Sequence, residues 1–221
     1  MTVTFSATKK HADAVLSNGN LTTMWDGDIG YQATLATDKA RGKVYFEVTV
    51  VKDYDNSNPY RVGIADNTGA SGASYDWSGS QSYAYEIDFT GAGHPYYKHT
   101  GDAGTLSTGS FALDGDVIGV AFDTDAGDFW ISQNGVWLKK LVGDSPDPAT
   151  GTDPIWTGIS TGTDWDAHVN IFSPGWDWGA TINFGGSSFS YTKPVGFDSY
   201  DSADAISDNL SSVGYSGVSI N

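Results

Sequence analysis

The sequence predicts an all-β fold, a single sandwich of two antiparallel sheets, and three observations carry this prediction. The stretch Phe111–Leu138 consists of three short apolar runs separated by turn signals. The segment Val44–Val50 alternates strictly between apolar residues and other residues, which is the period of a strand. Acidic residues are almost all aspartates, which favour turns and loop ends, whereas glutamate, the helix-favouring acid, occurs only at Glu47 and Glu86.

The first half of the chain is expected to supply strands separated by long loops. Residues 1–13 predict an irregular lead-in or an edge strand, and residues 16–23 a strand around an Asn18-Gly19 turn. In the next strand Val44, Phe46, Val48 and Val50 face one way, while Tyr45, Glu47 and Thr49 face the other, which predicts a half-buried strand. Further strands are expected at 61–65 and 83–89, with long Gly-rich loops at 66–82 and 90–110.

The second half begins with an antiparallel meander. Its predicted strands are Val117–Phe122, Phe129–Ser132 and Val136–Leu138. Asn134-Gly135 suits a type I′ hairpin, because both central residues must hold positive φ. Later strands are expected at 167–172 and 181–184, so that residues 14–198 form the sandwich and residues 199–221 a C-terminal extension.

The stretch Phe111–Leu138 resembles the core signature of the SPRY domain family. The pattern runs G-D-V-I-G-V, D-x-D-x-G, an aromatic strand and N-G-V, between residues 115 and 136. Residues 16–21, 42–50 and 62–65 resemble the opening strands of that family, and residues 147–159, 181–185 and 191–197 resemble its bacteriophage and prophage versions. The resemblance implies a concanavalin-like sandwich that binds its partner through loops at one end, here 52–61, 66–82 and 164–178.

Composition limits the partners and the compartment. The net charge of −16 repels nucleic-acid phosphates and anionic membranes, so neither is expected as a partner. The chain has no cysteine, which excludes disulfides and thiol chemistry and agrees with assembly in a reducing cytoplasm. The start MTVTFSATKK lacks the apolar core of a signal peptide, and no run is long enough to span a membrane.

Catalytic and metal-binding motifs are weak, and we assign no catalytic residue, metal or cofactor. Glu86-Ile87-Asp88 resembles the start of the E-x-D-x-(x)-E signature of laminarinase-type glycosidases, but no second glutamate follows to act as general acid. The favoured interpretation is outward polar residues on an amphipathic strand. Asp123-Thr124-Asp125 predicts a turn better than a calcium loop, because it lacks the downstream glutamate of an EF-hand. His94 and His99 give only a weak zinc signal.

Aromatic residues in predicted loops are the strongest candidates for ligand contacts. Eight aromatic residues lie in or beside loops: Trp25, Tyr54, Tyr60, Tyr75, Trp77, Trp165, Trp176 and Trp178. Ring faces stack on ligands while neighbouring Asp, Asn and Gly supply hydrogen bonds, although some of these rings are expected to cap the ends of the sandwich. The predicted ligand-binding residues are Tyr54, Tyr60, Arg61, Tyr75, Trp77, Trp165, Trp176 and Trp178.

The resemblance to bacteriophage and prophage versions of the SPRY family implies a non-enzymatic binding module on a bacteriophage virion. It is expected on the capsid or tail, made in the host cytoplasm, where it recognises a host surface glycan or protein. Other virion proteins are further expected partners, and residues 199–221 are expected to anchor the domain to them or to form a homo-oligomer. The alternatives are a capsid decoration or tail-assembly subunit without a host ligand, a polysaccharide-degrading enzyme and an intracellular adaptor.

Overall fold

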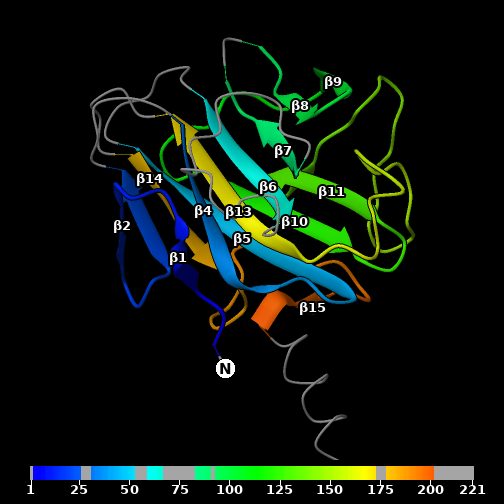
Figure 1. The fold of residues 1–221 in the computed structure, drawn as a ribbon. Coiled ribbons are helices and arrows are strands. Elements are labelled where there is room, and N and C mark those ends of the chain that lie inside the picture. The colour runs from blue at the N-terminus through cyan, green and yellow to red at the C-terminus, as the bar shows by residue number, and fades with distance from the viewer. Residues whose placement is uncertain are drawn as a thin grey trace, which may run out of the picture.

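A computed structural model describes residues 2–25, 31–52, 59–66, 83–90, 93–172 and 178–201. Within these residues the strands form two sheets that lie face to face (Figure 1). No helix in the described part of the chain is long and apolar enough to cross a membrane.

Sheet A contains the strands in the order β1-β4-β13-β6-β7-β8-β9, all antiparallel. Their bounds are β1 Phe5–Lys10, β4 Tyr31–Lys39, β13 Trp165–Phe172, β6 Tyr60–Asp66, β7 Ala84–Asp88, β8 Tyr96–His99 and β9 Asp102–Thr105. The edge strand β1 falls within the predicted lead-in.

Sheet B contains the strands in the order β12-β11-β10-β5-β14-β3-β2. Their bounds are β12 Val136–Trp137, β11 Asp128–Gln133, β10 Val117–Asp123, β5 Lys43–Lys52, β14 Trp178–Asn183, β3 Thr22–Trp25 and β2 Ala14–Ser17. These strands are antiparallel, and the short β15, Asp198–Ser199, adds a parallel pairing to β5. The predicted sandwich of two antiparallel sheets is confirmed.

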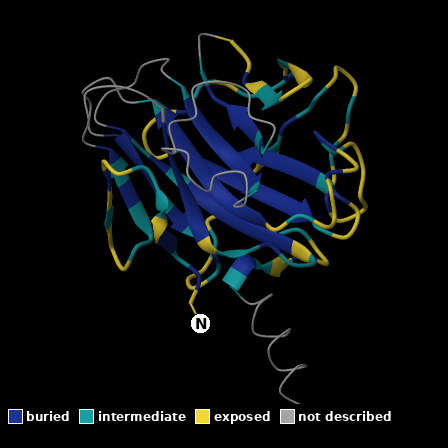
Figure 2. Cartoon of the chain, in the orientation of Figure 1, coloured by how far each residue is buried: buried dark blue, intermediate teal, exposed yellow. Residues whose placement is uncertain are grey.

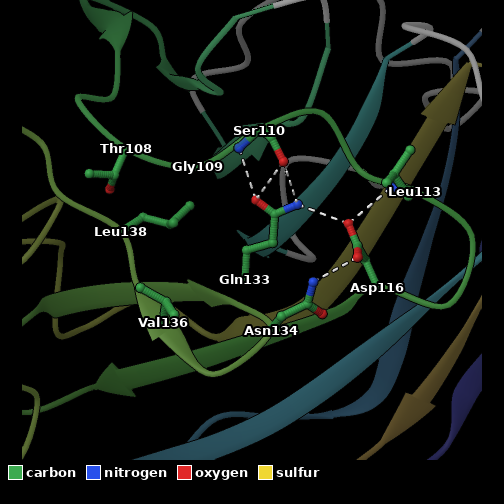
Figure 3. Close-up of a pocket in the computed structure, with 9 residues that line it drawn as sticks. All are labelled: Thr108, Gly109, Ser110, Leu113, Asp116, Gln133, Asn134, Val136 and Leu138. Carbon is green, nitrogen blue, oxygen red and sulfur yellow. Dashed lines mark hydrogen bonds between the residues drawn. The ribbon is translucent and has the colours of Figure 1, made fainter.

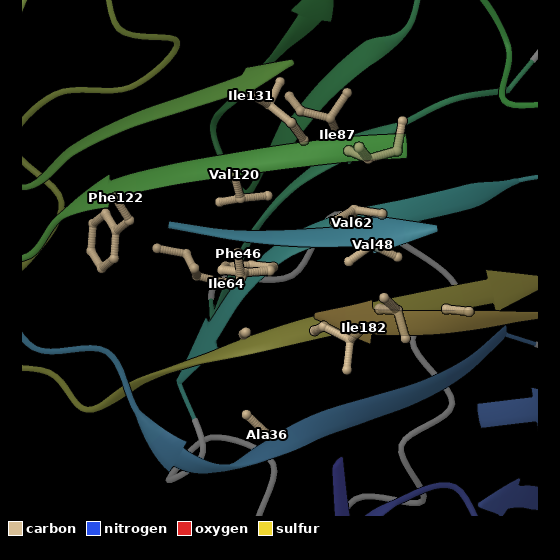
Figure 4. Packing of buried hydrophobic residues seen from close by; sticks show 14 of the residues in the cluster. Ala36, Phe46, Val48, Val62, Ile64, Ile87, Val120, Phe122, Ile131 and Ile182 are labelled. Carbon is tan, nitrogen blue, oxygen red and sulfur yellow. The ribbon is translucent and has the colours of Figure 1, made fainter. Parts of the chain in front are cut away.

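The core lies between the inner faces of the two sheets. Phe46 and Val48 of sheet B face Val62 and Ile64 of sheet A, all of them fully buried (Figure 4). Burial is continuous along the central strands, and the exposed residues gather in peripheral loops (Figure 2). The inward face predicted for β5 is therefore the one that packs in the core.

The predicted meander is present as β10, β11 and β12. The register of β10 on β11 runs from Ile118 opposite Gln133 to Asp123 opposite Asp128. Asn134 and Gly135 have φ angles of 52° and 78°, as a type I′ turn requires.

Besides the two-residue β15, strand β4 and the hairpin β8–β9 form where no strand is predicted from the sequence. Strand β4 was not expected, because it does not show the pattern of alternating apolar and polar residues. Gln32 and Thr34 point toward the interior, Ala33 and Leu35 line the opposite face, and all four are buried. The hairpin β8–β9 lies inside the expected loop 90–110, where glycines mask the strand signal.

The outer face of β5 is more covered than the predicted half-buried strand requires, because Tyr45 and Glu47 are buried there while Lys43 stays exposed. Tyr45 packs edge-on against Phe189, with ring centroids 4.8 Å apart. Both carboxylate oxygens of Glu47 are also engaged, accepting hydrogen bonds from the backbone N–H groups of Ser190 and Tyr191 at 2.7 and 2.9 Å. The segment that follows β14 thus folds back over sheet B, which a strand pattern cannot reveal.

The end of the sandwich lies beyond the predicted boundary at residue 198. Tyr200 is buried, and its hydroxyl donates to the backbone carbonyl of Asp38 and accepts from the N–H of Ala167, both in sheet A. Its ring packs edge-on against Phe46 of sheet B, 5.7 Å between centroids. Asp201 accepts a hydrogen bond from the backbone of Val3 at 2.8 Å. The described C-terminal residues therefore belong to the domain and tie its two sheets together.

Two buried tyrosines are expected to make the protein sensitive to alkali. The hydroxyl of Tyr45 donates to Glu47 Oε1 and that of Tyr60 to the carbonyl of Gly179, each at 3.0 Å. Burial, followed by the nearby carboxylates of Glu47 and Asp114 respectively, raises the pKa of both phenols well above the usual value of about 10. Since the folded state holds these protons more tightly, their stabilisation is complete below about pH 10 and declines as the pH rises further.

This prediction is checked by urea unfolding at a series of pH values from about 8 to 11.5, the upper half of which lies above the usual tyrosine pKa. The free energy of unfolding is expected to decline steeply above pH 10 and less steeply in Tyr45→Phe. The exposed Tyr96 provides the matched control, and Tyr96→Phe is expected to keep the wild-type slope. An unchanged slope in Tyr45→Phe would contradict the assignment.

Candidate binding pocket

A surface pocket of about 270 Å³ opens where the loop before β10 meets the β11–β12 hairpin (Figure 3). It is lined by Thr108, Gly109, Ser110, Leu113, Asp116, Gln133, Asn134, Val136 and Leu138. Leu113 and Val136 form exposed apolar walls, with 39% and 65% of their surface accessible, whereas Leu138 is buried. The pocket therefore combines apolar walls with a polar floor.

Gln133 organises the polar floor (Figure 3). Its side-chain carbonyl accepts from the backbone N–H of Ser110 at 3.0 Å. Its amide nitrogen lies 3.2 Å from Ser110 Oγ and donates to Asp116 Oδ2 at 2.9 Å. This one buried side chain joins the loop to the hairpin and fixes their relative position.

Asp116 receives three hydrogen bonds, all from uncharged donors. Oδ2 accepts from the backbone N–H of Leu113 at 3.0 Å and from Gln133, and Oδ1 accepts from Asn134 Nδ2 at 2.7 Å. The carboxylate takes part in none of the ion pairs found among the described residues. The pocket thus has a negative charge at its rim that no described cation balances.

Three of the predicted aromatic contacts, Trp165, Trp178 and Tyr60, are not exposed. All three are buried at strand ends. Trp165 Nε1 donates to the carbonyl of Ser160 at 2.8 Å, and the ring of Trp178 lies 4.5 Å from Lys52 Nζ. Trp25, the neighbour of Trp178 across the ladder, is fully buried as well. These rings close the core, as the capping alternative expected, and they offer no free face to a ligand.

The other predicted aromatic contacts, Tyr54, Tyr75, Trp77 and Trp176, lie outside the described residues. Their assignment as ligand contacts stays a prediction.

Arg61 is also buried, and it is paired with carboxylates of the neighbouring strand. Its guanidinium lies 3.0 Å from Glu86 Oε1 and 3.0 Å from Asp88 Oδ2, and all three side chains are buried on the outer face of sheet A. His168 Nε2 contacts Glu86 Oε2 at 3.1 Å, and Lys98 contacts Asp88 at 2.6 Å. Glu86 and Asp88 are on the predicted outward face, but they are buried and paired with Arg61, which excludes a solvated surface pair.

The remaining chemical motifs are occupied by local contacts. Asp123 Oδ1 accepts from the backbone N–H groups of Asp125 and Ala126, and Oδ2 pairs with Lys43 at 3.1 Å, so this segment is a turn as predicted. His94 Nδ1 lies 2.9 Å from the carbonyl of Gly109. Among the described residues no group of three or more metal-ligating side chains comes together.

Sequence reasoning did not single out Gln133 or the pocket it organises. A signal was present, because Phe129, Ile131 and Gln133 follow one another on the same face of β11. A polar side chain that continues an inward apolar row indicates a buried hydrogen-bonding role at the end of a strand.

Comparison with solved structures identifies the architecture. The SPRY domain of human HERC1 superposes with a TM-score of 0.62 at 18% sequence identity, covering 83% of this chain and 99% of that domain. The chain has the SPRY fold. No family model matches its sequence, and no curated protein matches it either.

The SPRY fold also matches part of a larger protein. Stonustoxin superposes with a TM-score of 0.55 at 14% identity, over 83% of this chain and 27% of the stonustoxin chain. At these identities the likeness shows the fold alone. The pocket and the ionic cluster of Arg61, Glu86, Asp88 and Lys98 are therefore interpreted from this chain's own residues.

Proposed function

We propose that this protein is a non-enzymatic binding module, and that its partner docks on the pocket between the 108–116 loop and the β11–β12 hairpin. The observation that carries the proposal is the pocket itself. Exposed Leu113 and Val136 flank the unbalanced carboxylate of Asp116, and Gln133 holds loop and hairpin together from below. Because the loop and the hairpin are already held in place, a partner can bind without the entropic cost of ordering them.

The setting that we propose is a bacteriophage virion, with the module exposed on the capsid or tail. The supporting observation is the resemblance of residues 147–159, 181–185 and 191–197 to phage and prophage sequences of this fold. The partner is then a glycan or protein of the host surface. The charge of −16 disfavours nucleic acid and anionic membrane as partners.

A second candidate function is a decoration or tail-assembly subunit. Exposed aliphatic side chains away from the pocket favour it, because Val142 is 94% and Val195 81% accessible. Residues of this kind are suited to contacts with other virion chains, or with further copies through residues 199–221. A polysaccharide hydrolase is disfavoured because Glu86, the one glutamate of the motif, is buried and engaged by Arg61 and His168.

The test is binding of labelled protein to candidate host cells and, in parallel, to particles that lack it. We expect saturable binding to cells that falls in the double variant Leu113→Ser/Val136→Ser. Val15, exposed on the distant β2 edge, provides the matched control, and Val15→Ser is expected to bind like the wild type. Binding to particles alone supports the assembly subunit, and binding to neither contradicts both functions.

A further inference from the structure

The negative charge at the pocket indicates that its ligand carries a positive charge. Asp116 accepts three hydrogen bonds, and a carboxylate offers about four acceptor positions. Among the described residues Oδ1 accepts from Asn134 alone, whereas Oδ2 accepts from two donors, so within this part of the chain one position on Oδ1 is open. A cationic donor would fill this position with a charge-assisted hydrogen bond.

The size and walls of the pocket indicate the rest of the ligand. At about 270 Å³ it is slightly smaller than the roughly 300–1,000 Å³ of pockets that enclose a whole small molecule. It is therefore suited to one or two side chains that project from a larger partner. Leu113 and Val136 provide aliphatic surface beside the carboxylate, so an aliphatic residue and a cation can be held together.

The composition of the lining distinguishes a peptide from a glycan. Sugar rings are bound by stacking on aromatic faces, and none of the nine lining residues is aromatic. The polar atoms of the floor already bond one another, with Gln133 satisfied by Ser110 and Asp116. Few hydroxyl partners remain for a neutral sugar, and the carboxylate repels an acidic one.

We propose that this pocket binds a peptide segment of a protein partner that presents a lysine or arginine beside an aliphatic side chain. This inference deepens the binding function proposed above and rests on it. The basic group contacts Asp116 Oδ1, and the aliphatic side chain packs between Leu113 and Val136. The net charge of −16 attracts such a segment before contact.

The experiment follows backbone amide shifts of the isotope-labelled full chain by NMR. The probes are acetyl-Leu-Arg-Leu-amide and the same peptide with citrulline, which has arginine's shape without its charge. We expect shifts confined to residues 109–117 and 133–138, and weaker binding of the citrulline peptide by roughly fivefold or more. The difference is expected to shrink as salt is raised.

A matched pair of variants tests the role of the carboxylate. Asp116→Asn is expected to abolish the preference for arginine over citrulline. Asp144 provides the control. Its side chain accepts from the backbone N–H of Leu141, three residues before it, just as Asp116 accepts from Leu113. Asp144 does not line the pocket. Asp144→Asn removes one charge equally and is expected to keep the preference.

Equal binding of both peptides, or shifts located elsewhere, would overturn the inference. A neutral oligosaccharide that shifts the same amides more than the peptides do would assign the pocket to a glycan. A further outcome is that cell binding depends on Leu113 and Val136 while neither peptide changes the amide shifts of the pocket. This result would refute a basic peptide as the ligand and leave the binding function intact. Loss of the peptide preference in both asparagine variants would trace it to net charge alone and also refute the site.

Discussion

Replacing Arg61 with alanine is expected to lower the free energy of unfolding by about 3–5 kcal/mol. The guanidinium lies between Glu86 and Asp88, 3.0 Å from an oxygen of each, and all three side chains are buried. Without the arginine the two carboxylates lose their shared cation while they stay out of water. A loss of this size is a large part of the roughly 5–15 kcal/mol by which domains are stable. Urea unfolding followed by tryptophan fluorescence measures it.

The matched control is an arginine in an exposed pair. Arg41 Nη2 lies 3.4 Å from Asp38 Oδ1, and both side chains are about 40% accessible. Arg41→Ala is expected to cost no more than about 1 kcal/mol, because surface ion pairs are screened by water. If Arg61→Ala proved as mild as Arg41→Ala, the ionic cluster would contribute little to the stability of sheet A.

Replacing Tyr200 with alanine is expected to cost about 3–5 kcal/mol of stability, as other large-to-small changes at buried aromatic residues do. The ring packs against Phe46 and Phe184, with centroids 5.7 and 5.2 Å away, and the hydroxyl bonds backbone groups of sheet A. The substitution therefore leaves a cavity between the sheets and unpaired polar groups beside it. The midpoint and slope of urea unfolding give the change.

Two further variants separate the contributions of Tyr200. Tyr200→Phe keeps the ring and removes the hydroxyl, so a smaller loss of about 1–2 kcal/mol is expected. The exposed Tyr96 serves as the control for removal of a tyrosine ring, and Tyr96→Ala is expected to lie within about 0.5 kcal/mol of the wild type. A wild-type stability for Tyr200→Ala would show that the C-terminal residues do not hold the two sheets together.

The strands with local signals were predictable, and those without were not. Asn134-Gly135 has the turn chemistry of a two-residue hairpin, and β10 and β5 each have one strictly apolar face, so the centre of sheet B followed from the sequence. Strand β4 was missed because Leu35 lies on the outer face and Gln32 on the inner one, and both faces are covered. A period of two is visible only where apolar residues are confined to one face of the strand, and in β4 they occur on both.

The candidate site was less predictable than the fold. Trp165 and Trp178 stand beside polar residues in the sequence, which suggested loops, but each begins a strand and is buried at its end. The pocket combines residues from 108–116 with Gln133 and Val136 across a hairpin. No short motif records that convergence, because it arises from the pairing of strands and the path of a loop.

The sequence by itself determined the fold class, the meander and its hairpin turn, since these depend on neighbouring residues, backbone φ preferences and the two-residue period of a strand. Only the tertiary structure decided which polar and aromatic groups are buried. Glu47 receives its backbone donors from Ser190 and Tyr191, and Arg61 meets carboxylates on the neighbouring strand. Burial is a property of whatever packs against a residue, and the chain brings those partners from far along its length.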